Sequence, residues 1–185
     1  MPLPETIACG LCVLRPWTLA DQDALVRYAN NRSIWRNLWD RFPHPYSESD
    51  ATEYLKSVTS SEMRQGNWAV EVKGEAVGAL SIVPHNDIEK LTAEIGYWLG
   101  EPLWGKGIAT AAVCAASEAA FTTTNLVRLY APVFAWNRPS MRVLEKAGYI
   151  REATLRRAGV KDGIVIDRVM FALTRDTGLR YESAP

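Results

Sequence analysis

The stretch that decides the fold is Trp104-Gly105-Lys106-Gly107-Ile108-Ala109-Thr110, which joins a strand-like run at 93–99 to an alanine-rich run that extends to Phe121. Glycines at such a junction let the backbone approach a ligand closely. The first N–H groups of a helix that begins here have no partner within the helix, and they lie at the positive end of its dipole. The stretch therefore predicts a site for a phosphate or pyrophosphate.

Composition limits the class of protein. The 185 residues are 48% hydrophobic, and we expect a single domain over 1–185 with its core at about 10–175. Lys+Arg and Asp+Glu balance at 21 each, so no net field favours nucleic acid or an anionic membrane. No apolar run reaches the roughly 18 residues that span a bilayer, and the N-terminus has no signal-peptide pattern. These features predict a cytoplasmic protein without nucleic-acid or membrane partners.

The hydrophobic pattern along the chain predicts an α+β fold. The expected strands are 12–16, 68–72, 76–83, 91–99, 126–134, 149–155 and 164–173. The expected helices are 21–31, 47–64, 105–122 and 137–147. Early hairpins followed by a strand–helix–strand–helix unit predict a mixed, mostly antiparallel sheet flanked by helices. This is an α/β sandwich rather than a doubly wound sheet.

Two nucleotide-binding motifs fit the glycine loop poorly. A dinucleotide fingerprint requires a glycine where Thr110 stands, and an acidic residue about 20 positions further on. A P-loop matches from Gly100 to Lys106, but Gly107 then replaces the Ser/Thr that binds magnesium. Neither motif accounts for the hairpins that precede the loop.

A third interpretation uses more of the chain. Residues 104–109 resemble the pyrophosphate loop R/Q-x-x-G-x-G/A of the GNAT superfamily of N-acetyltransferases. The resemblance extends to segments elsewhere, namely 14–16, 42–46, 93–99, Asn137-x-x-Ser140 and 145–149. Together these segments resemble the branch that includes the Rim-type ribosomal-protein N-terminal acetyltransferases.

The resemblance implies acetyl-CoA as co-substrate and no metal. Backbone N–H groups of the glycine loop would hold the pyrophosphate, and the pantetheine amides would pair with a strand edge exposed where two strands splay apart, with Gly96 as a bulge. Trp104 stands where the family has Arg or Gln, and Lys106 is a candidate phosphate contact. The expected cofactor-binding residues are Tyr97, Trp98, Leu99, Trp104, Gly105, Lys106, Gly107, Ile108, Ala109, Thr110 and Asn137.

The reaction requires loss of an amine proton and stabilisation of the leaving sulfur. Many relatives use a tyrosine seven residues after the Asn, where this chain has Leu144, so the resemblance leaves Ser140 as the hydroxyl that faces the sulfur. Glu94 is the candidate base, acting through water, with a plain rim carboxylate as the alternative. The Rim-type glutamate 19 residues beyond the serine is replaced by Gly159.

A weak base favours an acceptor of low pKa. Deprotonating a lysine at pH 7 costs about 4.6 kcal/mol, and an α-amine costs about 1.4 kcal/mol. The expected reaction is therefore acetyl transfer to a protein or peptide N-terminal α-amine. The alternatives are a small amine, such as a polyamine, amino acid or antibiotic, and a non-catalytic acyl-CoA-binding domain.

The remaining aromatic residues, cysteines and histidines are interpreted mainly as structural residues. Trp35, Trp39, Phe42 and Tyr46 form an aromatic segment that packs in the core, covers the acceptor side or forms a homodimer face. Cys9 and Cys12 have redox or zinc spacing, but no second pair follows, so ordinary strand-edge cysteines are expected. The two histidines, His44 and His85, are interpreted as surface or loop residues rather than catalysts.

Overall fold

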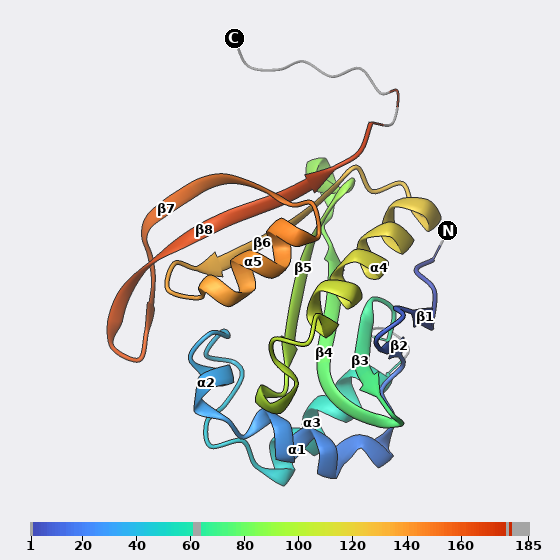
Figure 1. Cartoon of the computed structure of the whole chain (residues 1–185), viewed down its shortest axis with the longest axis vertical. Helices are drawn as coiled ribbons and strands as arrows, with labels where there is room; N and C mark the ends of the chain where they lie inside the picture. The colour runs from blue at the N-terminus through green and yellow to red at the C-terminus, as the bar shows by residue number, and fades with distance from the viewer. Residues whose placement is uncertain (1, 61–63, 177, 179–185) are drawn as a thin grey trace.

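The computed structural model describes residues 2–60, 64–176 and 178, and the strands in that part of the chain form one mixed sheet (Figure 1). The eight strands lie in the order β1-β2-β3-β4-β5-β6-β8-β7 within that part of the chain. They are β1 (Ile7–Ala8), β2 (Val13–Arg15), β3 (Asn67–Val72), β4 (Glu75–Pro84), β5 (Thr92–Leu99), β6 (Arg128–Phe134), β7 (Ile150–Lys161) and β8 (Ile164–Thr174). Neighbouring strands are antiparallel except β5 and β6, which confirms the predicted mixed, mostly antiparallel sheet.

Helices cover both faces of the sheet. They are α1 (Gln22–Ala29), α2 (Arg32–Trp35), α3 (Glu48–Thr59), α4 (Ile108–Thr123) and α5 (Arg138–Lys146), with 3-10 turns η1 (Leu19–Asp21), η2 (Asp87–Glu89) and η3 (Glu101–Leu103). Alternation along β3 divides the core between the two faces. Trp68 and Val70 pack into the cluster formed with α4 and α5, whereas Ala69 belongs to the cluster formed with α1 and α3. The α/β sandwich is therefore confirmed.

Several element boundaries differ from the predictions for local reasons. Helix α3 begins after the predicted N-cap Ser47, but it ends at Thr59 rather than near residue 64. At that end the hydroxyls of Thr59 and Ser60 donate to backbone carbonyls of the preceding turn, which competes with continued helix. Strand β7 continues beyond Leu155 to Lys161 through a register shift. Its first eight residues are all exposed, so no hydrophobic alternation marks the strand.

The sheet forks between β5 and β6. These parallel strands pair only at their beginnings, and Glu94 opposite Tyr130 is the last pair. Beyond it β5 follows β4 and β6 follows β8, so the two strands splay apart (Figure 1). The predicted splay is confirmed. The predicted bulge at Gly96 is wrong, because the β4–β5 register is continuous along the whole of β5.

Candidate active site

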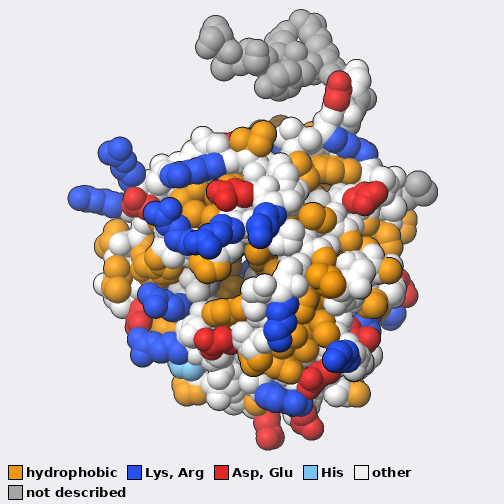
Figure 2. Space-filling view, in the orientation of Figure 1, with side chains coloured by type: hydrophobic (Ala, Val, Ile, Leu, Met, Phe, Trp, Pro, Cys, Tyr) orange, Lys and Arg blue, Asp and Glu red, His pale blue; other side chains and the backbone are white. Residues whose placement is uncertain are grey.

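A cavity of about 1290 Å³ occupies the fork. Its walls come from the ends of β4, β5 and β6, the loop after α2, the beginning of α4 and the inner side of α5. Figure 2 shows a hollow in the middle of the molecular face that Figure 1 presents, with lysine and arginine side chains gathered along one side of it. The cavity is large enough for an extended cofactor arm and an acceptor group together.

The beginning of α4 provides an anion site in this cavity. Gly105 and Gly107 have φ of 74° and 79°, the left-handed region that glycine adopts without steric cost. No side chain of the described residues caps the N-terminus of α4. The residues from Trp104 to Thr110 line the cavity, with Lys106 excepted. Their backbone geometry fits a pyrophosphate, as the sequence predicts.

The end of β5 forms the adjacent wall. Tyr97, Trp98 and Leu99 all line the cavity, and β6 does not pair with this part of β5. The Trp98 ring lies near Phe42, 5.9 Å between centroids. Trp104 Nε1 donates a 2.6 Å hydrogen bond to the Leu99 carbonyl. The Trp104 side chain thus fixes the turn between strand and loop.

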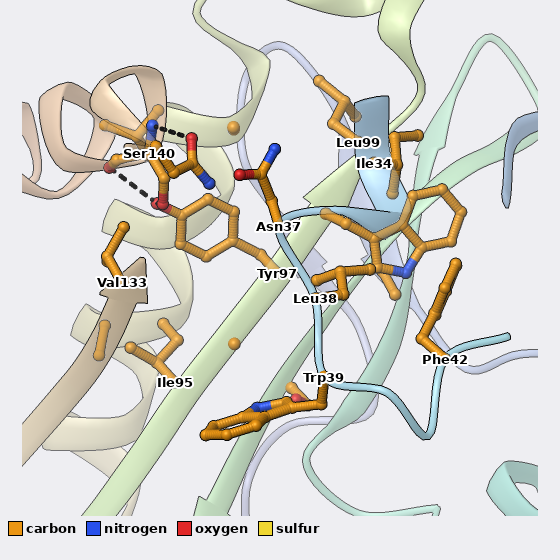
Figure 3. A pocket seen from close by; sticks show the side chains of 18 of the residues that line it. Ile34, Asn37, Leu38, Trp39, Phe42, Ile95, Tyr97, Leu99, Val133 and Ser140 are labelled. Atoms are coloured by element: carbon orange, nitrogen blue, oxygen red, sulfur yellow. Dashed lines mark hydrogen bonds between the residues drawn. The ribbon is translucent and has the colours of Figure 1, made fainter. Parts of the chain in front are cut away.

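Helix α5 places a hydroxyl pair opposite β5. The Asn137 side chain accepts a 3.2 Å hydrogen bond from the Ser140 backbone N–H, which caps α5. The Ser140 and Tyr97 hydroxyls lie 2.9 Å apart, and Tyr97 also contacts the Ser140 carbonyl at 3.1 Å (Figure 3). Burial raises the pKa of Tyr97, so its hydroxyl is protonated at neutral pH. Leu144 is fully buried in the core.

The last paired residues of β5 and β6, Glu94 and Tyr130, belong to a second cluster of polar side chains. Tyr130 Oη lies 3.5 Å from Glu94 Oε2 and 2.7 Å from His85 Nε2. The His85 ring stacks on Tyr130 at 5.6 Å, and its Nδ1 lies 3.7 Å from Glu89 Oε2. His85 lies in a loop directly after β4, as predicted, and its ring contacts Tyr130 and Glu89 there. Sequence reasoning missed this cluster because no fixed spacing relates its members.

The aromatic segment divides between core and cavity. Tyr46 is buried, whereas Trp39 and Phe42 line the cavity, and Trp39 is 41% exposed. Trp35 packs against the buried Lys161, whose Nζ lies 3.9 Å from the ring centroid and donates a 2.8 Å hydrogen bond to Asp40. The loop after α2 is thus fixed to the β7–β8 hairpin.

Three arginines lie in or beside the wall of the cavity. Arg36 lies over the Trp136 ring at 5.3 Å, Arg168 over Trp39 at 5.1 Å, and Arg41 lines the cavity. Within the described residues none of the three arginines forms an ion pair with a carboxylate. Sequence reasoning did not single them out. Neither did it single out Asn37, whose side chain points towards Ser140 and accepts a 3.1 Å hydrogen bond from Trp136.

The cysteines and histidines do not assemble a metal site. Cys9 and Cys12 flank a two-residue hairpin turn, and both are free thiols. In the described part of the chain no three His, Cys, Asp or Glu side chains come together as metal ligands. None of the helices described there has the length and apolarity needed to cross a bilayer.

Comparison with known proteins identifies the family. The family of acetyltransferase (GNAT) domains matches residues 12–150 of this chain. The chain belongs to the GNAT superfamily. It is accordingly an acetyl-CoA-dependent N-acetyltransferase, and the cavity at the fork of its sheet is the candidate site for this co-substrate.

Individual relatives agree with this assignment. The "Uncharacterized N-acetyltransferase p20" of Bacillus licheniformis is 31% identical over 176 residues, which cover 92% of this chain and 97% of the relative. The structure of Mycobacterium smegmatis RimJ in complex with a CoA disulfide is similar, with 29% identity and a TM-score of 0.78 over 94% of this chain and 86% of RimJ. A spermidine N(1)-acetyltransferase of Escherichia coli strain K12 is 29% identical over 142 residues, 77% of this chain and 74% of the enzyme. The Rim-like branch expected from the sequence is supported.

Proposed function

We propose that the acceptor is the N-terminal α-amine of a protein or peptide. The observation that carries this proposal is the charge of the cavity: Glu94 is the one carboxylate in its described lining, Arg36 and Arg41 also line it, and Arg168 lies over the lining residue Trp39. The nearby Asp40 is already held by the buried Lys161. An N-terminal α-amine needs one carboxylate near the reacting nitrogen. The peptide residues that follow the α-amine are compatible with neighbouring guanidinium groups.

The same charges disfavour a polyamine. Spermidine carries several ammonium groups, and each requires a carboxylate or an aromatic face to replace its hydration. Here the aromatic faces of Trp39 and Trp136 are already covered by arginines. These charges argue against a polyamine acceptor, even though the chain is similar to a spermidine acetyltransferase. Similarity to RimJ supports the proposal only as far as membership of the Rim-like branch.

The acid–base groups also favour an amine of low pKa. Gly159 lies in β7 opposite Ile166, where it supplies no carboxylate, so Glu94 is the one carboxylate among the cavity-lining residues of the described chain. An α-amine costs about 1.4 kcal/mol to deprotonate at pH 7, compared with about 4.6 kcal/mol for a lysine. One carboxylate acting through water is sufficient to deprotonate an α-amine and inefficient for a lysine amine.

The chain's residues then have the following roles. Backbone N–H groups of 105–110 bind the pyrophosphate, and the free side of β5 beyond Glu94 pairs with the pantetheine amides. Asn137 holds the beginning of α5 in place, so that Ser140 faces the thioester sulfur.

The chemical step is direct transfer. The amine nitrogen attacks the thioester carbon, the C–S bond breaks, and CoA leaves as its thiolate. The Ser140 hydroxyl donates a hydrogen bond to that sulfur, and Tyr97 keeps the hydroxyl oriented. Glu94 accepts the proton that the nitrogen loses.

Release of CoA thiol over a panel of amines tests the acceptor. We expect kcat/KM for a lysine-free peptide with a free N-terminus to exceed, by at least about 10-fold, kcat/KM for spermidine and for an N-acetylated peptide with one lysine. Equal or faster turnover of spermidine or lysine would contradict the proposal.

A charge reversal provides a matched control. Arg41→Glu is expected to raise kcat/KM for spermidine relative to the peptide, because it adds a carboxylate beside the cavity. Lys56→Glu makes the same change of charge at an exposed position on α3 that lies outside the cavity lining. It should leave the preference as it is in the wild type.

A further inference from the structure

A chain of polar groups leads from the fork to the protein surface. Glu94 and Tyr130 are the last paired residues before β5 and β6 separate; Glu94 lines the cavity, and Tyr130 lies beside it outside the lining. Tyr130 Oη bridges Glu94 Oε2, at 3.5 Å, and His85 Nε2, at 2.7 Å. The His85 side chain also lines the cavity and is 32% exposed, and its Nδ1 lies 3.7 Å from Glu89, which is 65% exposed and lies outside the lining. The acyl-transfer roles given above use only Glu94.

The reaction creates a need for such a path. At neutral pH the acceptor enters mostly as an ammonium, and the products are an amide and a thiol, so each turnover releases one proton. The proton is first accepted by Glu94, which the acceptor and the cofactor arm cover from the cavity side. Glu94 must lose it again before the next turnover.

We propose that Tyr130 and His85 relay this proton from Glu94 to solvent, a proposal that rests on the proposed role of Glu94 as the base. The protonated Glu94 carboxyl gives its proton to Tyr130 Oη, and Tyr130 gives its own hydroxyl proton to His85 Nε2. The imidazolium then loses its Nδ1 proton to water or through the Glu89 carboxylate. Glu94 and Tyr130 are then back in their starting states, His85 is left protonated at Nε2 and regains its Nδ1–H tautomer by proton exchange with water before the next turnover, and no electrons are transferred. Tyr130 and His85 are positioning and relay residues rather than catalytic ones.

The surroundings suit each member of the relay. Burial, and then the neighbouring Glu94 carboxylate, raise the pKa of Tyr130, so it stays a neutral hydroxyl that can donate and accept together. Stacking of the His85 ring on Tyr130, with 14° between planes, keeps Nε2 directed at the hydroxyl.

The charged groups around the relay come from three elements. Glu89 of η2 faces His85, Glu94 of β5 faces Tyr130, and Arg128 of β6 lowers the Tyr130 pKa slightly while paired with Glu152. The carboxylates on either side of His85 and Tyr130 stabilise the transient imidazolium.

The pH profile of kcat/KM with the peptide acceptor tests the relay. At pH 7 we expect His85→Gln and Tyr130→Phe each to lower kcat/KM about 10-fold, a moderate effect for an acid–base group. The double variant should be no slower than Tyr130→Phe alone, because either substitution interrupts the same path. Above about pH 9, where an α-amine is already neutral, all three variants should approach the wild-type rate. The Kd for CoA should not change.

His44→Gln is the matched control, because His44 also stacks on an aromatic ring, that of Trp35, but contacts no carboxylate in the described structure. It should keep the wild-type profile. A loss that is equal at all pH values, or additive effects in the double variant, would overturn the relay.

Glu94→Gln separates this inference from the proposed function. If Glu94→Gln slows transfer and the His85 and Tyr130 variants do not, only the relay is wrong. If Glu94→Gln has no effect, its role as the base fails as well. The acceptor preference is measured independently, with the amine panel.

Discussion

Gly105→Ala is expected to raise the Kd for CoA by at least about 10-fold. Gly105 has φ of 74°, and an alanine in this left-handed region costs about 1–2 kcal/mol. To relieve the strain the loop must rotate the peptide groups that precede α4, and these groups carry the N–H donors for the pyrophosphate. One lost charge-assisted hydrogen bond is sufficient for the predicted change. Titration calorimetry with CoA measures it.

Gly74→Ala is the matched control for this variant. Gly74 has φ of 83° in the β3–β4 turn, and a Cβ added at either glycine meets no atom within 4 Å. Both variants therefore carry the same kind of backbone strain without a steric clash, and both should lose a similar part of the free energy of unfolding. Only Gly105→Ala should weaken CoA binding. Equal affinity in the two variants would show that the loop does not hold the cofactor.

Ser140→Ala is expected to lower kcat about 100-fold with little change in the Kd for CoA. The Ser140 hydroxyl is proposed to meet negative charge that develops on the sulfur only during the reaction, so its loss affects the transition state and not the bound cofactor. In this variant Tyr97 remains in place, but its hydroxyl contacts the position of the Ser140 hydroxyl and lies further from the sulfur than Ser140 does. Single-turnover rates and calorimetry separate the two quantities.

The chain contains a second serine–tyrosine pair that serves as control. Ser117 on α4 and Tyr149 share a 2.8 Å hydrogen bond in the buried core, and neither residue lines the cavity. Ser117→Ala removes a comparable bond and should cost about 1 kcal/mol of stability without a change in kcat. Equal losses of kcat and CoA affinity in Ser140→Ala would refute the chemical role of Ser140.

Those parts of the site that lie within one continuous segment could be predicted from the sequence. The glycine loop is followed directly by α4, and Ser140 stands three residues after the cap Asn137, so the local geometry follows from spacing alone. The strand edge at 97–99 was expected where the structure has it, because the resemblance covers the whole of β5.

The rest depends on contacts between distant segments. Glu94, Tyr130 and His85 come from three elements, and only the register of the fork brings them together. The arginines in and beside the cavity wall are equally scattered along the sequence, and each taken alone has the sequence signature of a solvated residue. The extent of β7 could not be predicted either, because its exposed residues do not alternate in polarity.

Calorimetric comparison of CoA with pantetheine tests the central claim most directly, because pantetheine keeps the amide arm and thiol but lacks the phosphates. If the uncapped N-terminus of α4 holds the pyrophosphate, CoA should bind at one site per chain, and pantetheine should bind at least about 100-fold more weakly. Equal affinities for the two compounds, or no saturable heat with CoA, would contradict the account.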